Sequence, residues 1–247
     1  MSSSPPEMSA TPDRAMVLAA GLGTRMRPLT DARPKPLVEV EGRALIDHVL
    51  ERLEQAHIRH VVVNLHYRAD MLEAHLRALP GFDIRFSDER RALLDTGGGI
   101  RQALPLLGAQ PFFVLNTDSI WAGAPASPLG LLARQWRDRD MDCLLLLARR
   151  EGAIGYDGAG DFDLMDDGRV RRRGEAPLAA YAHTGTCLIH PRLFQDCPEG
   201  AFSLNLLWDR ALTSGRLYAA VLEGQWMHIG DPGAVGAAEA WLKANGQ

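Results

Sequence analysis

Residues 15–30 read AMVLAAGLGTRMRPLT, an apolar run that leads directly into a glycine-rich turn. The first six residues have the length and composition of a buried strand. The two glycines that follow lack the Cβ atoms that would hold an anion away from the backbone N–H groups. Arg25 comes next, and Lys35 follows ten residues later between two prolines. Glycine amides beside several cations suit a triphosphate, whose charge must be neutralised while one phosphorus atom is attacked.

The same stretch excludes two common phosphate-binding motifs. A dinucleotide-binding G-x-G-x-x-G motif needs glycine at position 26, where the chain has Met26. A Walker A loop needs Gly-Lys-Ser/Thr, which does not follow these glycines. In the alternative interpretation, the glycines only allow a tight turn after the strand and the arginines are exposed to solvent. We prefer the phosphate site because prolines on both sides stiffen the segment around Lys35.

Strand-like and helix-like segments alternate through the first 150 residues. Short apolar runs predict strands at residues 15–20, 61–65, 82–86, 112–115 and 143–148. The spacing of apolar residues predicts helices at residues 44–56, 69–79, 100–107 and 129–139. This alternation predicts an α/β fold of the Rossmann-like, doubly wound type, with a mixed, mostly parallel sheet. In such sheets ligands bind at the carboxyl ends of the strands.

The pattern changes after about residue 155. Residues 161–165 and 169–173 flank Asp166-Asp167-Gly168, which predicts a hairpin. Further strands are predicted at residues 186–189 and 217–222, and further helices at 203–214 and 234–243. This second half has the character of a smaller lid region laid on the first. We therefore expect one domain over residues 15–247, with halves 15–150 and 151–247, after a disordered Ser- and Pro-rich tail at residues 1–14.

Composition and charge exclude several classes of protein. The 247 residues carry a formal net charge of −4, with no basic excess to follow a nucleic-acid backbone. No apolar run approaches the roughly 20 residues that a membrane helix needs. Three cysteines without a C-x-x-C pair favour a reducing cytoplasm over a disulfide framework or a structural zinc site. Only two of the 27 Lys and Arg residues are lysines, Lys35 and Lys243, which marks Lys35 as a candidate catalytic residue.

The pattern LAAGxGTRxxPLT at residues 18–30, followed by Pro34-Lys35-Pro36, resembles the signature of the sugar-1-phosphate nucleotidyltransferases. The resemblance extends over nearly the whole chain from residue 15 onward. It implies a reaction in which a nucleoside triphosphate and a sugar 1-phosphate give a nucleotide-sugar and pyrophosphate. It also implies that the first half of the chain binds the nucleotide and the second half the sugar.

The resemblance assigns roles to the residues of the phosphate turn. The residues implied to hold the nucleotide phosphates are Ala20, Gly21, Gly23 and Thr24. Arg25 would neutralise the departing β- and γ-phosphates, and Lys35 the α-phosphate together with the incoming sugar phosphate. Because the sugar phosphate is already an anionic nucleophile, positioning and charge neutralisation suffice and no general base is required.

A second glycine cluster, Asp95-Thr96-Gly97-Gly98-Gly99, lies between a predicted strand and a predicted helix. Bare backbone allows a planar ring to approach closely, and the resemblance implies that Thr96, Gly97 and Gly98 contact the nucleobase. The alternative interpretation is a flexible loop or a helix N-terminus.

The resemblance also implies a metal site with Mg²⁺. Asp118 follows the predicted strand at residues 112–115, and Mg²⁺ prefers one or two carboxylates together with phosphate oxygens. The family's second carboxylate lies in a Trp-x-Asp-x-Gly-Thr-Pro motif, but residues 226–232 read WMHIGDP, with His228 in place of Asp and Asp231 in place of Thr. Imidazole suits transition metals better than Mg²⁺. A site for Mn²⁺, a ligand role for Asp231 and a structural role for His228 therefore stay open.

The resemblance places Asn116, Thr184 and Gly185 beside the sugar. A run of four arginines would attract an acidic sugar, unless it covers a solvated hairpin face: Arg169, Arg171, Arg172 and Arg173. Within the family the chain is most similar to N-acetylmuramate-1-phosphate uridylyltransferases of cell-wall recycling, with mannose-1-phosphate guanylyltransferases as the alternative. The expected substrates are thus UTP or GTP and a sugar 1-phosphate.

Two other functions compete with this interpretation. A non-catalytic nucleotide-sugar-binding homologue would explain His228 at the position of the expected carboxylate. A nicotinamide-dependent oxidoreductase would also have a glycine-rich turn after its first strand, but Met26 argues against it.

Overall fold

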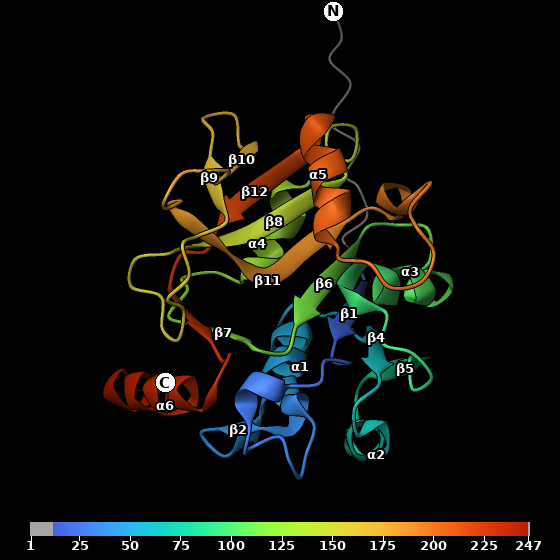
Figure 1. Cartoon of the computed structure of the whole chain (residues 1–247), viewed down its shortest axis with the longest axis vertical. Helices are drawn as coiled ribbons and strands as arrows, with labels where there is room; N and C mark the ends of the chain where they lie inside the picture. Colours follow the sequence, from blue (N-terminus) through green and yellow to red (C-terminus); the bar gives the residue numbers. More distant parts are fainter. Residues whose placement is uncertain (1–11, 247) are drawn as a thin grey trace, which may run out of the picture.

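A nine-stranded sheet runs through the computed structural model, which describes residues 12–246 (Figure 1). Its first half is parallel, with the strands in the order β6-β1-β4-β5. Their bounds are Phe112–Asn116, Arg14–Leu18, His60–Leu65 and Asp83–Asp88. The four strands predicted in this part of the chain are confirmed to within two residues at each end. Their apolar runs are continuous because both faces of the sheet are covered: in β1, Ala15 and Val17 pack in one hydrophobic core and Met16 in the other.

The second half of the sheet is mixed, and β11 (Tyr181–Ile189) joins it to the first. This strand pairs antiparallel with β6 on one side and with β8 (Cys143–Arg149) on the other. Strand β12 (Leu217–Val221) adds to β8 in parallel. The predicted hairpin is confirmed as β9 (Phe162–Leu164) and β10 (Val170–Arg172), and it attaches at Tyr181. Both halves of the chain therefore contribute strands to one continuous sheet.

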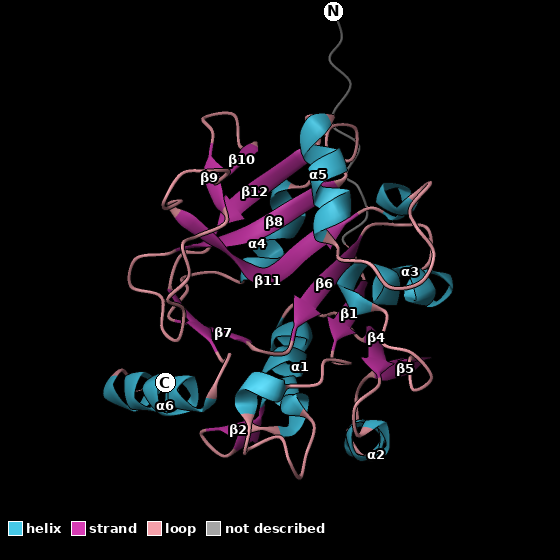
Figure 2. Ribbon diagram, viewed as in Figure 1, coloured by secondary structure: helices cyan, strands magenta, loops and turns pink. Residues whose placement is uncertain are grey.

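Helices cover both faces of this sheet (Figure 2). One face carries α1, α2 and α4, with bounds Leu45–Gln55, Ala69–Arg77 and Pro128–Gln135, and most of their buried apolar residues belong to one hydrophobic core. The other face carries α3 (Asp95–Leu107) and α5 (Asn205–Thr213), whose apolar residues belong to the second core. The prediction of a doubly wound α/β fold is confirmed.

A third, smaller core lies beside the sheet and was not predicted. It is formed by α6 (Pro232–Ala244), Leu45 of α1 and three strands that belong to two short pairs. These pairs are β2 with β3 and β7 with β13, with bounds Glu39–Val40, Arg43–Ala44, Ser119–Ala122 and Gln225–His228. Strands of two to four residues are too short for the alternation of side chains to mark them in a sequence. The β7–β13 pair nevertheless matters for the site, since its register sets His228 opposite Ser119.

The tail predicted at residues 1–14 lies mostly outside the described part of the chain. At its end the prediction needs correction, because Arg14 is the first residue of β1 and its Nη1 donates a hydrogen bond to the carbonyl oxygen of Leu106 at 2.9 Å. None of the described helices combines the length and the apolar composition that crossing a lipid bilayer requires.

Candidate active site

A cavity of about 470 Å³ opens at the carboxyl ends of β1 and β6, where a doubly wound sheet places its ligands. Among the residues predicted for the site, those that line it are Ala20, Gly21, Gly23, Thr24, Arg25, Lys35, Thr96, Asn116 and Asp118. These residues come from four separate segments of the chain. The fold therefore brings the predicted phosphate residues together with Thr96 and Asp118, whereas Gly97, Gly98, His228 and Asp231 do not line the cavity.

The phosphate turn is held from below by two hydrogen bonds. The backbone N–H of Ala19 donates to Oδ1 of Asn64 at 2.7 Å, and the Thr30 hydroxyl donates to the carbonyl oxygen of Gly23 at 2.8 Å. Gly23 has φ of +63°, which favours glycine, and it begins the short 3-10 helix Thr24–Met26. Gly21 has no atom within 4 Å of the place where a Cβ would lie. The turn is thus rigid at its base and open toward the cavity.

Gly21→Ala is expected to weaken nucleotide binding without harming the fold. The new methyl group would enter the cavity that Gly21 lines and keep an anion away from the backbone amides. We expect KM for the nucleoside triphosphate to rise about tenfold, equivalent to roughly 1.4 kcal/mol. Gly236→Ala, in an equally open position in α6, is the matched control and should leave KM unchanged. Equal KM values for the two variants would count against a phosphate-binding role for this turn.

Lys35 and Asp118 form an ion pair in the cavity, with 2.6 Å between Nζ and Oδ2. Lys35 begins the 3-10 helix Lys35–Leu37, and Asp118 lies in the turn between β6 and β7. Their side chains are only 13% and 19% exposed. Burial raises the pKa of Asp118, but the Lys35 ammonium and His228 outweigh it, so that the pKa lies below its ordinary value. The carboxylate is therefore ionised at neutral pH.

His228 lies close to this pair because β13 runs beside β7. The backbone N–H of Ile229 donates to the carbonyl oxygen of Asp118 at 2.8 Å. The His228 ring packs near the rings of Trp226 and Tyr156, with centroids 5.9 and 6.3 Å away. Burial lowers the pKa of His228, and Lys35 and Arg25 act in the same direction against the opposing pull of Asp118. The imidazole is thus neutral at neutral pH and keeps a free lone pair.

Asp231 has a structural role, which explains its presence without a metal-binding function. It is the N-cap of α6, where Oδ1 accepts the backbone N–H of Ala234 at 3.0 Å. Within residues 12–246 no group of three or more His, Cys, Asp and Glu side chains is arranged to hold a metal ion. Any metal in this cavity would therefore depend mainly on Asp118 and on oxygen atoms of the substrates.

The second glycine cluster forms the first turn of α3, the helix N-terminus that the alternative interpretation named. Gly97 and Gly98 are buried, and both backbone N–H groups donate to the carbonyl oxygen of Phe202, at 2.9 and 3.1 Å. A Cβ on Gly97 would lie 2.3 Å from the Phe202 ring, and one on Gly98 would lie 2.2 Å from the carbonyl oxygen of Gly200. Packing against residues 200–204 is therefore the reason for these glycines. Asp95 and Thr96 line the cavity, whereas Gly97 and Gly98 do not.

Gly98→Ala should destabilise the protein, because backbone blocks the space that its Cβ needs. Neither the α3 turn nor Gly200 can yield without breaking the hydrogen bonds to Phe202. We expect the free energy of unfolding to fall by about 2 kcal/mol in a denaturant titration. Gly236→Ala, a glycine in open space within α6, serves as control and should be neutral or slightly stabilising. An unchanged midpoint for Gly98→Ala would contradict the packing described here.

Glu89 connects the wall of the cavity with the phosphate turn. Its Oε1 accepts a hydrogen bond from Nδ2 of Asn64 at 2.7 Å, and its Oε2 accepts the backbone N–H of Leu94 at 3.0 Å. Since Asn64 also holds Ala19, one buried carboxylate ties the turn to the segment before α3. The role of Glu89 could not be found in the sequence, because Asn64, which links it to the turn, lies on β4, 25 residues away.

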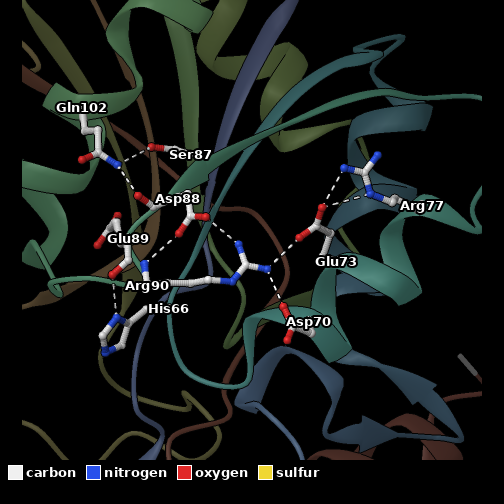
Figure 3. Close-up of polar contacts among 9 residues, drawn as sticks. All are labelled: His66, Asp70, Glu73, Arg77, Ser87, Asp88, Glu89, Arg90 and Gln102. Atoms are coloured by element: carbon white, nitrogen blue, oxygen red, sulfur yellow. Dashed lines mark hydrogen bonds and ion pairs between the residues drawn. The ribbon is translucent and has the colours of Figure 1, made fainter.

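A network of charged side chains holds the same segment from outside (Figure 3). Arg90 donates hydrogen bonds to three carboxylates, those of Asp70 and Glu73 at 2.7 Å and that of Asp88 at 2.6 Å. The same figure shows the carbonyl oxygen of Glu89 bound to the ring of His66 at 2.7 Å. Exposed ion pairs add little stability singly, but this network fixes the end of β5 against α2.

A second cavity, of about 280 Å³, adjoins the first and shares Leu18, Asp95, Thr96 and Asn116 with it. Gly185, predicted beside the sugar, lines this cavity and lies against Asn116, with 2.8 Å between its hypothetical Cβ and the Asn116 Cβ. Thr184 does not line it. That side chain is 1% exposed, and its hydroxyl donates to the carbonyl oxygen of Leu146 at 2.9 Å. The structure thus gives Thr184 a role in the β11 bulge instead of a place in the cavity lining.

Several residues of the second cavity were not indicated by the sequence. They come from β9, β11 and α5 and from the turns beside them, and are Asp161, Phe162, His183, Asn205 and Trp208. Of the four arginines in the basic run, Arg172 alone appears in the lining of this cavity. Arg169 and Arg171 form ion pairs on the surface, as the interpretation of a solvated hairpin face predicts, while the attraction of an acidic sugar stays a prediction.

Comparisons with known proteins agree with this geometry. A family model described as nucleotidyl transferase matches residues 14–243. The chain is 48% identical to an N-acetylmuramate alpha-1-phosphate uridylyltransferase of Caulobacter vibrioides, over 95% of this chain and 99% of that one. It is 30% identical to the mannose-1-phosphate guanylyltransferase catalytic subunit beta of Danio rerio, over 89% and 61%. The fold is similar to that of a putative glucose-1-phosphate thymidylyltransferase of Bacillus anthracis, with a TM-score of 0.75, 17% identity and coverage of 92% and 94%.

Proposed function

The chain belongs to the nucleotidyl transferase family, and from this premise we propose that it joins UTP to N-acetylmuramate 1-phosphate with release of pyrophosphate. The observation that supports the chemistry is the meeting of a glycine turn, Arg25, Lys35 and Asp118 in one cavity that adjoins a second, polar cavity. The relative at 48% identity, which the chain matches almost end to end, supports the choice of sugar and base.

The residues of the first cavity perform the transfer by positioning and charge neutralisation. An oxygen of the sugar phosphate attacks the α-phosphorus of UTP, and the bond from that phosphorus to the bridging oxygen of the β-phosphate breaks. The backbone amides of the phosphate turn hold the triphosphate. Arg25 neutralises the pyrophosphate that leaves, and Lys35 neutralises the α-phosphate and the incoming sugar phosphate. No proton needs to be removed from the nucleophile.

The cofactor proposed for this site is Mg²⁺, held by Asp118 and by phosphate oxygens of the substrates. An ionised carboxylate at the edge of a phosphate-binding cavity fits the oxygen ligands that Mg²⁺ prefers. The ion would supply additional neutralisation of the triphosphate charge. The neutral imidazole of His228 suits a transition metal, so that Mn²⁺ is the second candidate ion.

The proposed substrate also sets the cellular role. N-acetylmuramate is a sugar of the bacterial cell wall, so its activation belongs to the recycling of peptidoglycan. Two of the three cysteines are buried and all three are free, which agrees with an enzyme of the reducing cytoplasm.

A substrate panel tests the proposal. UTP and GTP are each combined with the 1-phosphates of N-acetylmuramate, mannose, glucose and N-acetylglucosamine, and pyrophosphate release is measured. We expect the highest kcat/KM for UTP with N-acetylmuramate 1-phosphate. If the enzyme prefers GTP with mannose 1-phosphate, the proposed substrates are wrong, but the proposed nucleotidyl transfer stands. Binding without turnover of any pair would favour a non-catalytic nucleotide-sugar-binding protein.

A further inference from the structure

Arg172 is the one arginine among the residues that line the second cavity, and its position is built by the fold. It ends β10 and pairs in register with Phe162 of β9. Its neighbour Arg171 is 75% exposed and pairs with Asp163 at 3.3 Å on the surface. Because successive side chains of a strand point to opposite faces, the hairpin turns one of these two arginines inward and the other outward.

The guanidinium of Arg172 is held firmly in place. It stacks over the rings of Phe162 and Trp208, at 4.7 and 5.9 Å from their centroids. Its Nε donates to Oδ1 of Asp209 at 2.9 Å, and its Nη2 donates to Oδ1 of Asn205, also at 2.9 Å. Aromatic stacking and two fixed hydrogen bonds lower the entropy that a ligand would otherwise have to remove from this side chain.

One end of the guanidinium is left for a ligand. Within residues 12–246, Nη1 of Arg172 donates no hydrogen bond to any protein atom, and its side chain is 30% exposed at the cavity. The carboxylate of Asp209 is 62% exposed, so solvent screens its pairing and leaves positive charge on the arginine. The guanidinium of Arg172 is therefore fixed in orientation but keeps one nitrogen, Nη1, available for a ligand.

The carboxylates around the cavity have other partners. Oδ2 of Asp161 accepts the backbone N–H of His183 at 2.8 Å, and Oδ1 of Asp95 accepts the N–H of Thr96 at 2.5 Å. The two carboxylates can accept hydrogen bonds from the hydroxyl groups of a sugar. Arg172 adds a positive charge, which a neutral sugar would not require. The cavity adjoins the proposed nucleotide cavity and shares Asn116 with it, a position that suits the second substrate of the transfer.

We propose that Arg172 is a specificity-determining residue that binds a carboxylate of the sugar substrate and selects acidic over neutral sugar phosphates. This inference rests on the proposed function and names the group that separates its sugar from others. N-acetylmuramate differs from N-acetylglucosamine by a lactyl ether that carries one carboxylate. The fixed guanidinium can donate a charge-assisted hydrogen bond from Nη1 to such a group.

The test compares two sugars in matched variants of the full chain. The ratio of kcat/KM for N-acetylmuramate 1-phosphate to that for N-acetylglucosamine 1-phosphate, with UTP, is measured in the wild type, Arg172→Gln and Arg171→Gln. We expect Arg172→Gln to lower this ratio about 10- to 100-fold, mainly through KM of the acidic sugar phosphate. KM for UTP and turnover of the neutral sugar phosphate should stay within about twofold. Arg171→Gln should behave as wild type, because its side chain lies outside the cavity.

The outcomes separate the inference from the function on which it rests. If the wild type prefers the acidic sugar and Arg172→Gln keeps that preference, the role of Arg172 is wrong while the proposed function stands. If Arg172→Gln slows both sugars equally, the residue is structural and the inference also fails. If the wild type prefers a neutral sugar phosphate, both are overturned. Should Arg172→Gln not fold, Arg172→Lys keeps the charge without the fork and is expected to lower the ratio in the same direction by a smaller factor.

Discussion

Lys35→Arg is expected to lower turnover by at least about 100-fold while the protein remains folded. The Lys35 ammonium lies 2.6 Å from Asp118 in a cavity where its side chain is 13% exposed. A guanidinium is larger and planar, so it cannot take the place of a compact ammonium between a carboxylate and two phosphates. The measurements are the rate of pyrophosphate release and the thermal midpoint of unfolding.

The chain supplies its own control for this variant. Lys243, the only other lysine of the sequence, lies in the last turn of α6 and is exposed. Lys243→Arg is expected to leave both rate and midpoint unchanged. If Lys35→Arg also kept near-normal kinetics, the scarcity of lysine would be a feature of composition alone, and Lys35 would have no catalytic role.

Asp118→Asn is expected to lower kcat by about 100- to 1,000-fold and to weaken the response to Mg²⁺. Asparagine has the same shape, so the change removes a charge and leaves the cavity intact. Two effects add: the proposed metal loses its carboxylate, and Lys35 loses its partner in the ion pair. The activity is measured as a function of Mg²⁺ and of Mn²⁺ concentration, with the thermal midpoint as a check on folding.

His228→Ala is the comparison for this second variant. If Asp118 is the main anchor of the metal and His228 a weaker one, His228→Ala should cost about tenfold in apparent metal affinity, and more with Mn²⁺ than with Mg²⁺. Full metal-dependent turnover of Asp118→Asn would show that the metal is held elsewhere. A larger loss in His228→Ala than in Asp118→Asn would reverse the two assignments.

The parallel half of the fold could be predicted from sequence because both faces of its strands are buried. Continuous apolar runs such as those of β1 and β6 are then distinct from the amphipathic helices between them. The β7–β13 pair could not be found in this way. Its four-residue strands are more than one hundred residues apart, and only their pairing in space stabilises them.

The residues of the site likewise fall into those that local motifs mark in the sequence and those that only the folded chain brings together. The phosphate turn, Lys35 and Asp118 lie on or beside local motifs, and the structure brings them into one cavity. The glycines of α3 lie at a helix N-terminus, as the alternative interpretation had it, and their packing against Phe202 could not be foreseen because Phe202 is more than one hundred residues away. Arg172 could not be distinguished from its neighbours in the sequence. The hairpin register, which decides which arginine faces the cavity, is a property of the folded chain.

The β7–β13 pair has a consequence for the order in which the enzyme becomes competent during synthesis. Trp226 binds the Ser119 hydroxyl through its indole N–H at 2.8 Å, and the N–H of Ile229 holds the carbonyl oxygen of Asp118. A nascent chain that has not yet extended beyond Gln225 lacks this strand, although its parallel strands have all been made. The turn that carries Asp118 then lacks the hydrogen bond from Ile229 that fixes it. The parallel strands can therefore pair before the turn that carries Asp118 is fixed, and β13 is the segment that fixes it.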